Sequence, residues 1–237
     1  MKKKILASLL VGGAVVGASL SPLSAQATTT GKTPVTVGIE GGTLPDVGGD
    51  GNTVRPDPDA ENSNFDLLFI PREYDFGKLS ISDDLTKPIP NKKDEGQNGH
   101  IESVGVGDMR GTKEGWHLTV QSDGMKLGEE SLEGSITANI TLYPLIYDAE
   151  TNKYLHQNTS FLDPITKPEV IANERAWTLP LGGEAVLMAN ATAGKGQGLW
   201  DFTMFTTSLN LTTTANEIKA GNYTGNITWN LVAGPSL

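Results

Sequence analysis

The sequence predicts an all-β fold, a single antiparallel sandwich-like domain, mainly because apolar and polar residues alternate with a period of two. The alternation is clear over four stretches, residues 116–121, 136–142, 200–204 and 223–231. Such strands place one face on a core and the other in water, as antiparallel sheets do. Glycine-rich stretches at 105–115, 124–134 and 194–198 are expected to be the turns between strands. No long helical pattern competes, and only residues 168–176 suggest a short helix.

The chain is expected to begin with a signal peptide over residues 1–27. Three lysines precede an apolar stretch over residues 5–20, and Ala25-Gln26-Ala27 matches the A-x-A cleavage pattern. Cleavage after Ala27 leaves no membrane span. An uncleaved membrane anchor is the alternative, which the short, glycine-interrupted run disfavours.

Residues 28–64 are expected to form a flexible acidic linker, so the domain occupies residues 65–237. The segment is rich in glycine, proline and aspartate and holds few large apolar residues. It therefore buries too little surface to offset the entropy of ordering it. Its aspartates do not have the EF-hand spacing, so a solvated tether is favoured over a calcium site.

Composition argues against several classes of protein. The chain has no cysteine and a net charge of −10, so neither a disulfide-stapled domain nor a nucleic-acid binder is expected. The three histidines, His100, His117 and His156, lack metal-ligand spacing, and no nucleophile motif is present. We expect no enzyme activity, no cofactor and no metal. A carboxylate pair for glycoside hydrolysis is recognised by distance rather than by sequence, and Glu114 would be its first candidate.

Two Trp-x-Leu motifs are the candidate binding residues, Trp116 with Leu118 and Trp229 with Leu231. In a strand, residues i and i+2 share a face, so each motif presents an aromatic ring beside a leucine. These side chains are either part of the core or the lining of a groove that faces a ligand or partner. A third match, Trp177-Thr178-Leu179, is expected to be a coincidence whose tryptophan packs in the core or a loop.

With these motifs, the chain resembles the WxL-domain cell-surface proteins of low-GC Gram-positive bacteria. The similarity covers about residues 65–237 and includes Phe76-Gly77, Asp108-Met109-Arg110-Gly111, both Trp-x-Leu sites, Gly198-Leu199-Trp200 and Ala220-Gly221-Asn222-Tyr223. The resemblance implies a secreted protein of the cell wall and cell surface that binds peptidoglycan non-covalently. It also implies assembly with a WxL-interacting protein and other WxL proteins. On this interpretation the four motif residues bind the wall, supported by Asp108 and Arg110.

Two functions remain open at this point. The first is a binding module that docks on peptidoglycan, and the second is a structural subunit that binds a partner protein without touching the wall.

Asp108 and Arg110 form either a local ion pair or a site in which Arg110 binds a carboxylate of a wall stem peptide. Because protein and wall are both acidic, binding has to rest on local complementarity rather than on bulk charge. Neither a lipid-anchor cysteine nor a sortase motif is present, so attachment is expected to be non-covalent.

Overall fold

The computed structural model describes residues 32–46, 52–57, 59, 63–92, 101–151, 153–157, 165–171 and 176–236. The predicted signal peptide and residues 28–31 lie outside these ranges. The chain divides into two units, residues 1–38 and 39–237, and every described strand belongs to the second. Within the described residues, no helix has the length and apolar character needed to cross a membrane.

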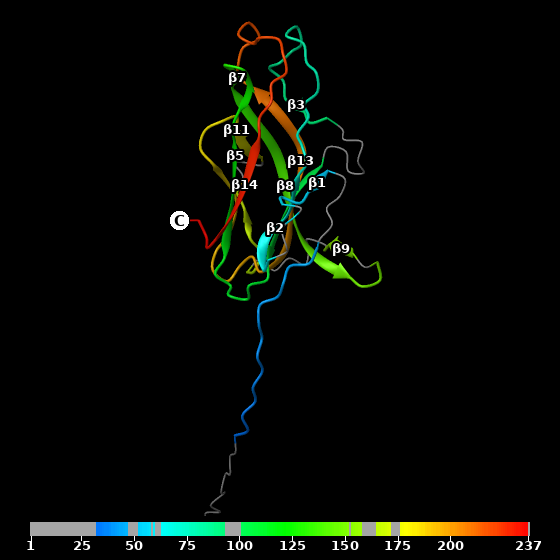
Figure 1. Ribbon diagram of the computed structural model, residues 1–237, viewed down its shortest axis with the longest axis vertical. Helices are drawn as coiled ribbons and strands as arrows, with labels where there is room; N and C mark the ends of the chain where they lie inside the picture. The colour runs from blue at the N-terminus through cyan, green and yellow to red at the C-terminus, as the bar shows by residue number, and fades with distance from the viewer. Residues whose placement is uncertain are drawn as a thin grey trace, which may run out of the picture. The chain divides into compact units, whose positions relative to one another are not determined.

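The second unit contains two main antiparallel sheets, which confirms the all-β prediction (Figure 1). The larger sheet runs in the order β1 (Thr53–Val54), β2 (Phe65–Pro71), β4 (Glu102–Asp108), β13 (Gly198–Leu211), β8 (Gly134–Asp148) and β11 (Trp177–Pro180), with β3 (Ile89–Pro90) paired to β13 and β9 (Lys153–His156) paired to β8. The smaller sheet runs in the order β10 (Glu169–Val170), β12 (Val186–Ala191), β5 (Trp116–Ser122) and β14 (Ile227–Ala233). A separate hairpin joins β6 (Met125–Leu127) to β7 (Glu130–Leu132).

The core lies between the two sheets and follows the period-two pattern of the sequence. In β5, Trp116, Leu118 and Val120 are fully buried, whereas His117 and Thr119 between them are half-buried. They pack with buried residues of β4 and β13 in one apolar cluster. The rings of Trp116 and Phe202 meet edge to face with centroids 6.1 Å apart, so the two layers are joined through the first motif.

The turn expected from residue 105 onward is wrong over its first part, because Gly105 and Gly107 lie inside β4. These glycines make room for side chains that pack directly on the strand. A Cβ on Gly105 would lie 2.6 Å from the ring of Phe69, and one on Gly107 would lie 2.4 Å from Leu44. Glycine within a strand here marks a close approach rather than a chain reversal.

The expected helix at 168–176 is replaced, where the structure describes it, by the short strand β10. Residues 172–175 lie outside the described residues. Residues 169–170 are extended because they pair with the edge of β12, where Glu169 lies opposite Asn190 and Val170 opposite Ala189. Tertiary pairing therefore overrides a weak local helical pattern.

Part of the segment expected to be linker packs on the domain. Strand β1 pairs with the end of β2, and Leu44 is 3% exposed in a second apolar cluster with Leu68 and Phe69. The amide of Gly42 also donates a hydrogen bond to the carbonyl of Met109 at 2.9 Å. Leu44 fills the space that Gly107 leaves open. The average composition of this glycine- and proline-rich stretch does not reveal that one leucine in it packs on the domain.

Candidate functional site

The structure places the two Trp-x-Leu motifs on neighbouring strands. Strands β5 and β14 pair antiparallel, with Leu118 directly opposite Leu231 and Trp229 opposite Val120. Figure 1 shows the two strands running side by side along the smaller sheet. Segments separated by most of the domain in sequence therefore form one continuous two-stranded unit.

The first motif is part of the core. Trp116 and Leu118 are 0% exposed, so neither side chain touches solvent. The indole Nε1–H of Trp116 donates a 2.9 Å hydrogen bond to the carbonyl of Gly196, and Trp200 donates to the same oxygen at 2.9 Å. Gly196 has φ +77° and lies so close that a Cβ there would be 2.4 Å from Trp116 Nε1. This carbonyl is a structural feature of the core that the sequence indicated only as part of a turn.

The second motif is less enclosed. Trp229 and Leu231 are both half-buried although they face the core. The ring of Trp229 stacks on Trp177 of β11, with centroids 6.3 Å apart and an angle of 23° between planes. Trp177 is 3% exposed, in agreement with the expected core packing, but its contact with Trp229 makes it part of the motif's surroundings.

These positions give the two motifs different roles. Trp116 and Leu118 cannot touch a ligand in this structure, and they hold the sheets together from within. Trp229 and Leu231 keep part of their surface accessible at the edge of the smaller sheet. That the four residues act together in wall binding stays a prediction, in which the first motif acts as support beneath a surface.

Asp108 and Arg110 form a local ion pair that is nearly buried. Nε and Nη2 of Arg110 donate to the two carboxylate oxygens of Asp108 at 2.9 and 2.8 Å, and the side chains are 10% and 2% exposed. Arg110 also pairs with Glu114, donates to the Gly115 carbonyl at 3.0 Å and lies 3.8 Å from the ring centre of Phe65. The bound carboxylate of Asp108 raises the pKa of the Arg110 guanidinium. Since the guanidinium is already paired within the domain, we do not assign it to a ligand, and Glu114 is likewise engaged.

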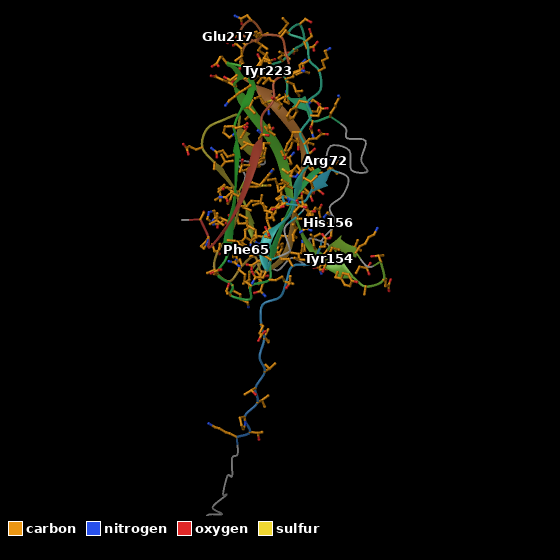
Figure 2. All side chains as sticks on the ribbon, in the orientation of Figure 1. Phe65, Arg72, Tyr154, His156, Glu217 and Tyr223 are labelled. Carbon is orange, nitrogen blue, oxygen red and sulfur yellow. The ribbon has the colours of Figure 1, made fainter. Side chains whose placement is uncertain are left out.

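A hollow of about 780 Å³ opens at the end of the sandwich near the β6–β7 hairpin. Its main walls are the loops over residues 76–81 and 218–224, and Figure 2 shows Tyr223 and Glu217 at this end, opposite Phe65. The lining is largely apolar and includes Phe76, Leu79, Ile81, Met125, Ile218 and Tyr223. Lys78 and Lys219 also line it, and neither forms an ion pair with another described residue.

Two aspartates fix the walls of the hollow. Asp75 accepts a hydrogen bond from the amide of Gly77 at 2.7 Å, and Asp123 accepts two from Asn226, at 2.6 Å from the amide and 3.0 Å from the side chain. These bonds to the charged carboxylates lower the pKa of both aspartates. The Asp75 bond closes a turn within the first loop, whereas the Asp123 bonds tie the chain just after the second loop to the end of β5.

The described histidines are engaged with other protein groups. His117 Nδ1 lies 2.8 Å from the Gly234 carbonyl, and His156 Nε2 lies 2.7 Å from Asp201. His100 lies outside the described residues. In the part of the chain that the structure describes, no three histidine, aspartate or glutamate side chains gather as a metal site requires.

Comparison with protein families gives one match across nearly the whole chain. The family described as "WxL domain surface cell wall-binding" matches residues 25–235. No curated protein matches the chain, and no solved structure matches it. The paired Trp-x-Leu strands and this match agree with each other: the chain belongs to the WxL family of surface cell-wall-binding domains.

Proposed function

We propose that this protein is exported, attaches non-covalently to peptidoglycan and there joins a surface complex. The observation that supports this most directly is the match of residues 25–235 to a surface cell-wall-binding family. Peptidoglycan is the wall polymer whose sugars, acetamido groups and stem-peptide carboxylates offer the local contacts that an acidic protein needs.

We place the wall contact at the hollow lined by Phe76 and Tyr223, which none of the four Trp-x-Leu residues lines, so on this proposal the motifs support the domain and do not touch the wall. Its volume of about 780 Å³ lies within the range of about 300–1,000 Å³ that is usual for ligand sites. The apolar lining suits the methyl groups of alanine, lactyl and acetamido units, and the aromatic rings suit sugar faces. Lys78 and Lys219 suit stem-peptide carboxylates, because each is a cation without a protein partner among the described residues.

Two other lysines of the domain already have acidic partners. Lys87 lies 2.9 Å from Asp84, and Lys92 lies 3.4 Å from Asp75, so the charge of each is already partly balanced. In a chain of net charge −10, two lysines that have no ion pair among the described residues and line one hollow favour an anionic ligand there.

The second candidate function is a structural subunit that binds a WxL-interacting partner without touching the wall. The observation that favours it is strand β14, which lies at the open edge of the smaller sheet and carries no charged residue. An edge of that kind is a template for pairing with another chain.

A binding assay on stripped sacculi separates the two. Purified residues 28–237 are incubated with peptidoglycan freed of protein and teichoic acid, and the retained fraction is measured. We expect retention, and we expect Lys78→Gln with Lys219→Gln to weaken it by about tenfold or more, since both cations meet carboxylates. Lys153→Gln on the distant strand β9 is the matched control and should bind like the unmodified chain.

Three outcomes decide between the proposals. Retention only after a partner protein is added supports the subunit and refutes direct wall binding. Retention that is insensitive to the paired lysine change refutes the hollow as the contact but leaves wall binding intact. Release from whole cells only by muramidase, and not by concentrated chaotrope, refutes non-covalent attachment.

A further inference from the structure

The segment before the domain carries an alternating set of exposed apolar side chains. Val35, Val37 and Ile39 are 90%, 84% and 89% exposed, the three highest values for large apolar residues in the described ranges. They are spaced two apart in extended chain, with Thr36 and Gly38 between them. This is the pattern of a strand with one apolar face, and no described strand pairs with it.

The smaller sheet ends in a strand that lacks a partner on one side. Among the described strands β14 pairs with β5 only, and its free edge lies near β2 without a ladder between them. Its inward-facing residues Ile227, Trp229 and Leu231 pack against the main core cluster but remain half-buried. The core is therefore open to solvent along this edge.

This edge has few of the protections that proteins usually place on exposed strands. Natural edges are blunted by lysines, prolines, bulges or very short length. β14 is seven residues long with the sequence Ile-Thr-Trp-Asn-Leu-Val-Ala, and its ladder with β5 runs without a register shift. An uncharged, regular edge favours pairing with another strand. The half-buried inward-facing side chains of β14, which we call the open seam, would be covered by such a strand.

We propose that residues 33–40 of one copy add as a strand to the free edge of β14 in a second copy. Val35, Val37 and Ile39 then face the open seam and cover Trp229 and Leu231. The eight residues match the seven of β14 in length. The occupant is a second copy because donor and acceptor are both present on this chain, and because charge does not oppose their meeting: Glu40 is the only charged residue in the two strands.

The contact joins two different surfaces, so it is head-to-tail. Copies then add one after another, or two copies exchange their segments reciprocally. This assembly does not depend on the proposed wall binding, because the hollow near Tyr223 takes no part in it. Failure of either proposal leaves the other standing.

The first test measures the mass of residues 28–237 by sedimentation velocity over a range of concentrations. We expect association that Val37→Asp weakens by more than about tenfold, since it places a carboxylate against an apolar seam. Thr36→Asp adds the same charge to the same segment but on the outward face, and it should associate like the unmodified chain. A monomer up to millimolar concentration, or equal effects of the two changes, would overturn the proposal.

The second test exploits the absence of cysteine from the chain. Leu231→Cys in one tagged copy is mixed with Val35→Cys, Val37→Cys or Ile39→Cys in another, and disulfide formation between copies is followed under mild oxidation. At least one of these three should cross-link faster than Thr36→Cys, because a disulfide needs Cβ atoms about 4 Å apart. Melting curves establish that each variant is folded, and cross-linking no faster than with Thr36→Cys contradicts the strand register.

Discussion

Replacing the tryptophans in pairs should show that Trp229 is coupled to Trp177 and not to Trp116. In β14, Trp229 is four residues from Ala233, the residue opposite Trp116, which is about 14 Å along a strand at about 3.4 Å per residue. Trp116 packs on Phe202, whereas Trp229 stacks on Trp177 at 6.3 Å. Among the described residues, the two motif tryptophans therefore share no ring partner.

The expected magnitudes follow from these contacts. In double-mutant cycles with leucine, Trp177 and Trp229 should couple by about 0.5–1.5 kcal/mol, as stacked aromatic pairs do. Trp116 and Trp229 should be additive to within about 0.5 kcal/mol, as distant sites are. Leucine is preferred to alanine because it fills part of the space and keeps the double variants folded.

The assay is equilibrium unfolding in urea. Two-state behaviour is checked by requiring the same m-value, the slope of the unfolding free energy against urea concentration, in every variant. Coupling between Trp116 and Trp229 above about 1 kcal/mol, or none between Trp177 and Trp229, would refute this description of the core. A further check is Trp177→Phe, which should cost less than Trp116→Phe. The Trp177 Nε1–H is buried with no partner among the described residues, whereas that of Trp116 is bonded to Gly196.

Three more predictions concern other parts of the molecule. Gly105→Ala should destabilise the domain by about 1–3 kcal/mol in the same assay, because the new Cβ would lie 2.6 Å from Phe69; an unchanged urea midpoint would contradict the close packing. Asp123→Ala should destabilise the loop at Asn226 at neutral pH but not in strong acid. Since the folded pKa of Asp123 is lowered, its contribution is complete above about pH 5 and is lost as the pH falls through that lowered value. Stability difference curves against pH measure this, and a difference that persists in strong acid would refute it. The mature protein should begin at Thr28, which N-terminal sequencing of the surface protein checks; an intact Met1 would refute cleavage.

The strands were the most predictable part of the fold. Alternation marks the central parts of β5, β8 and β13 directly. A shift of one residue in register would move every apolar side chain to the other face of the sheet, so the pattern determines which face is buried. The last strand is shorter than its pattern suggests. Residues 223–226 continue the alternation but leave the sheet, because Asp123 holds Asn226 and turns the segment into a wall of the hollow.

The site was less predictable because its contacts join distant residues. Sequence indicates two Trp-x-Leu pairs, but not that Gly196 accepts from Trp116 or that Trp177 stacks on Trp229. Likewise, the alternation of Val35, Val37 and Ile39 is hidden when the segment is judged by average composition. Average composition indicates whether a segment can fold alone. It does not indicate which other strand the segment can pair with.

The pairing of β5 with β14 has a consequence for the order in which the chain is built. Synthesis delivers the N-terminal end first, and β14 is the last strand of the sequence. Both neighbours of β5, β12 and β14, follow it by a long interval, so Trp116 lacks its two strand neighbours until residues 186–191 and then residues 227–233 have been made. Pairing over such sequence distances is slow to form. The smaller sheet is therefore completed late in synthesis, because its last pairing waits until residues 227–233 have been made.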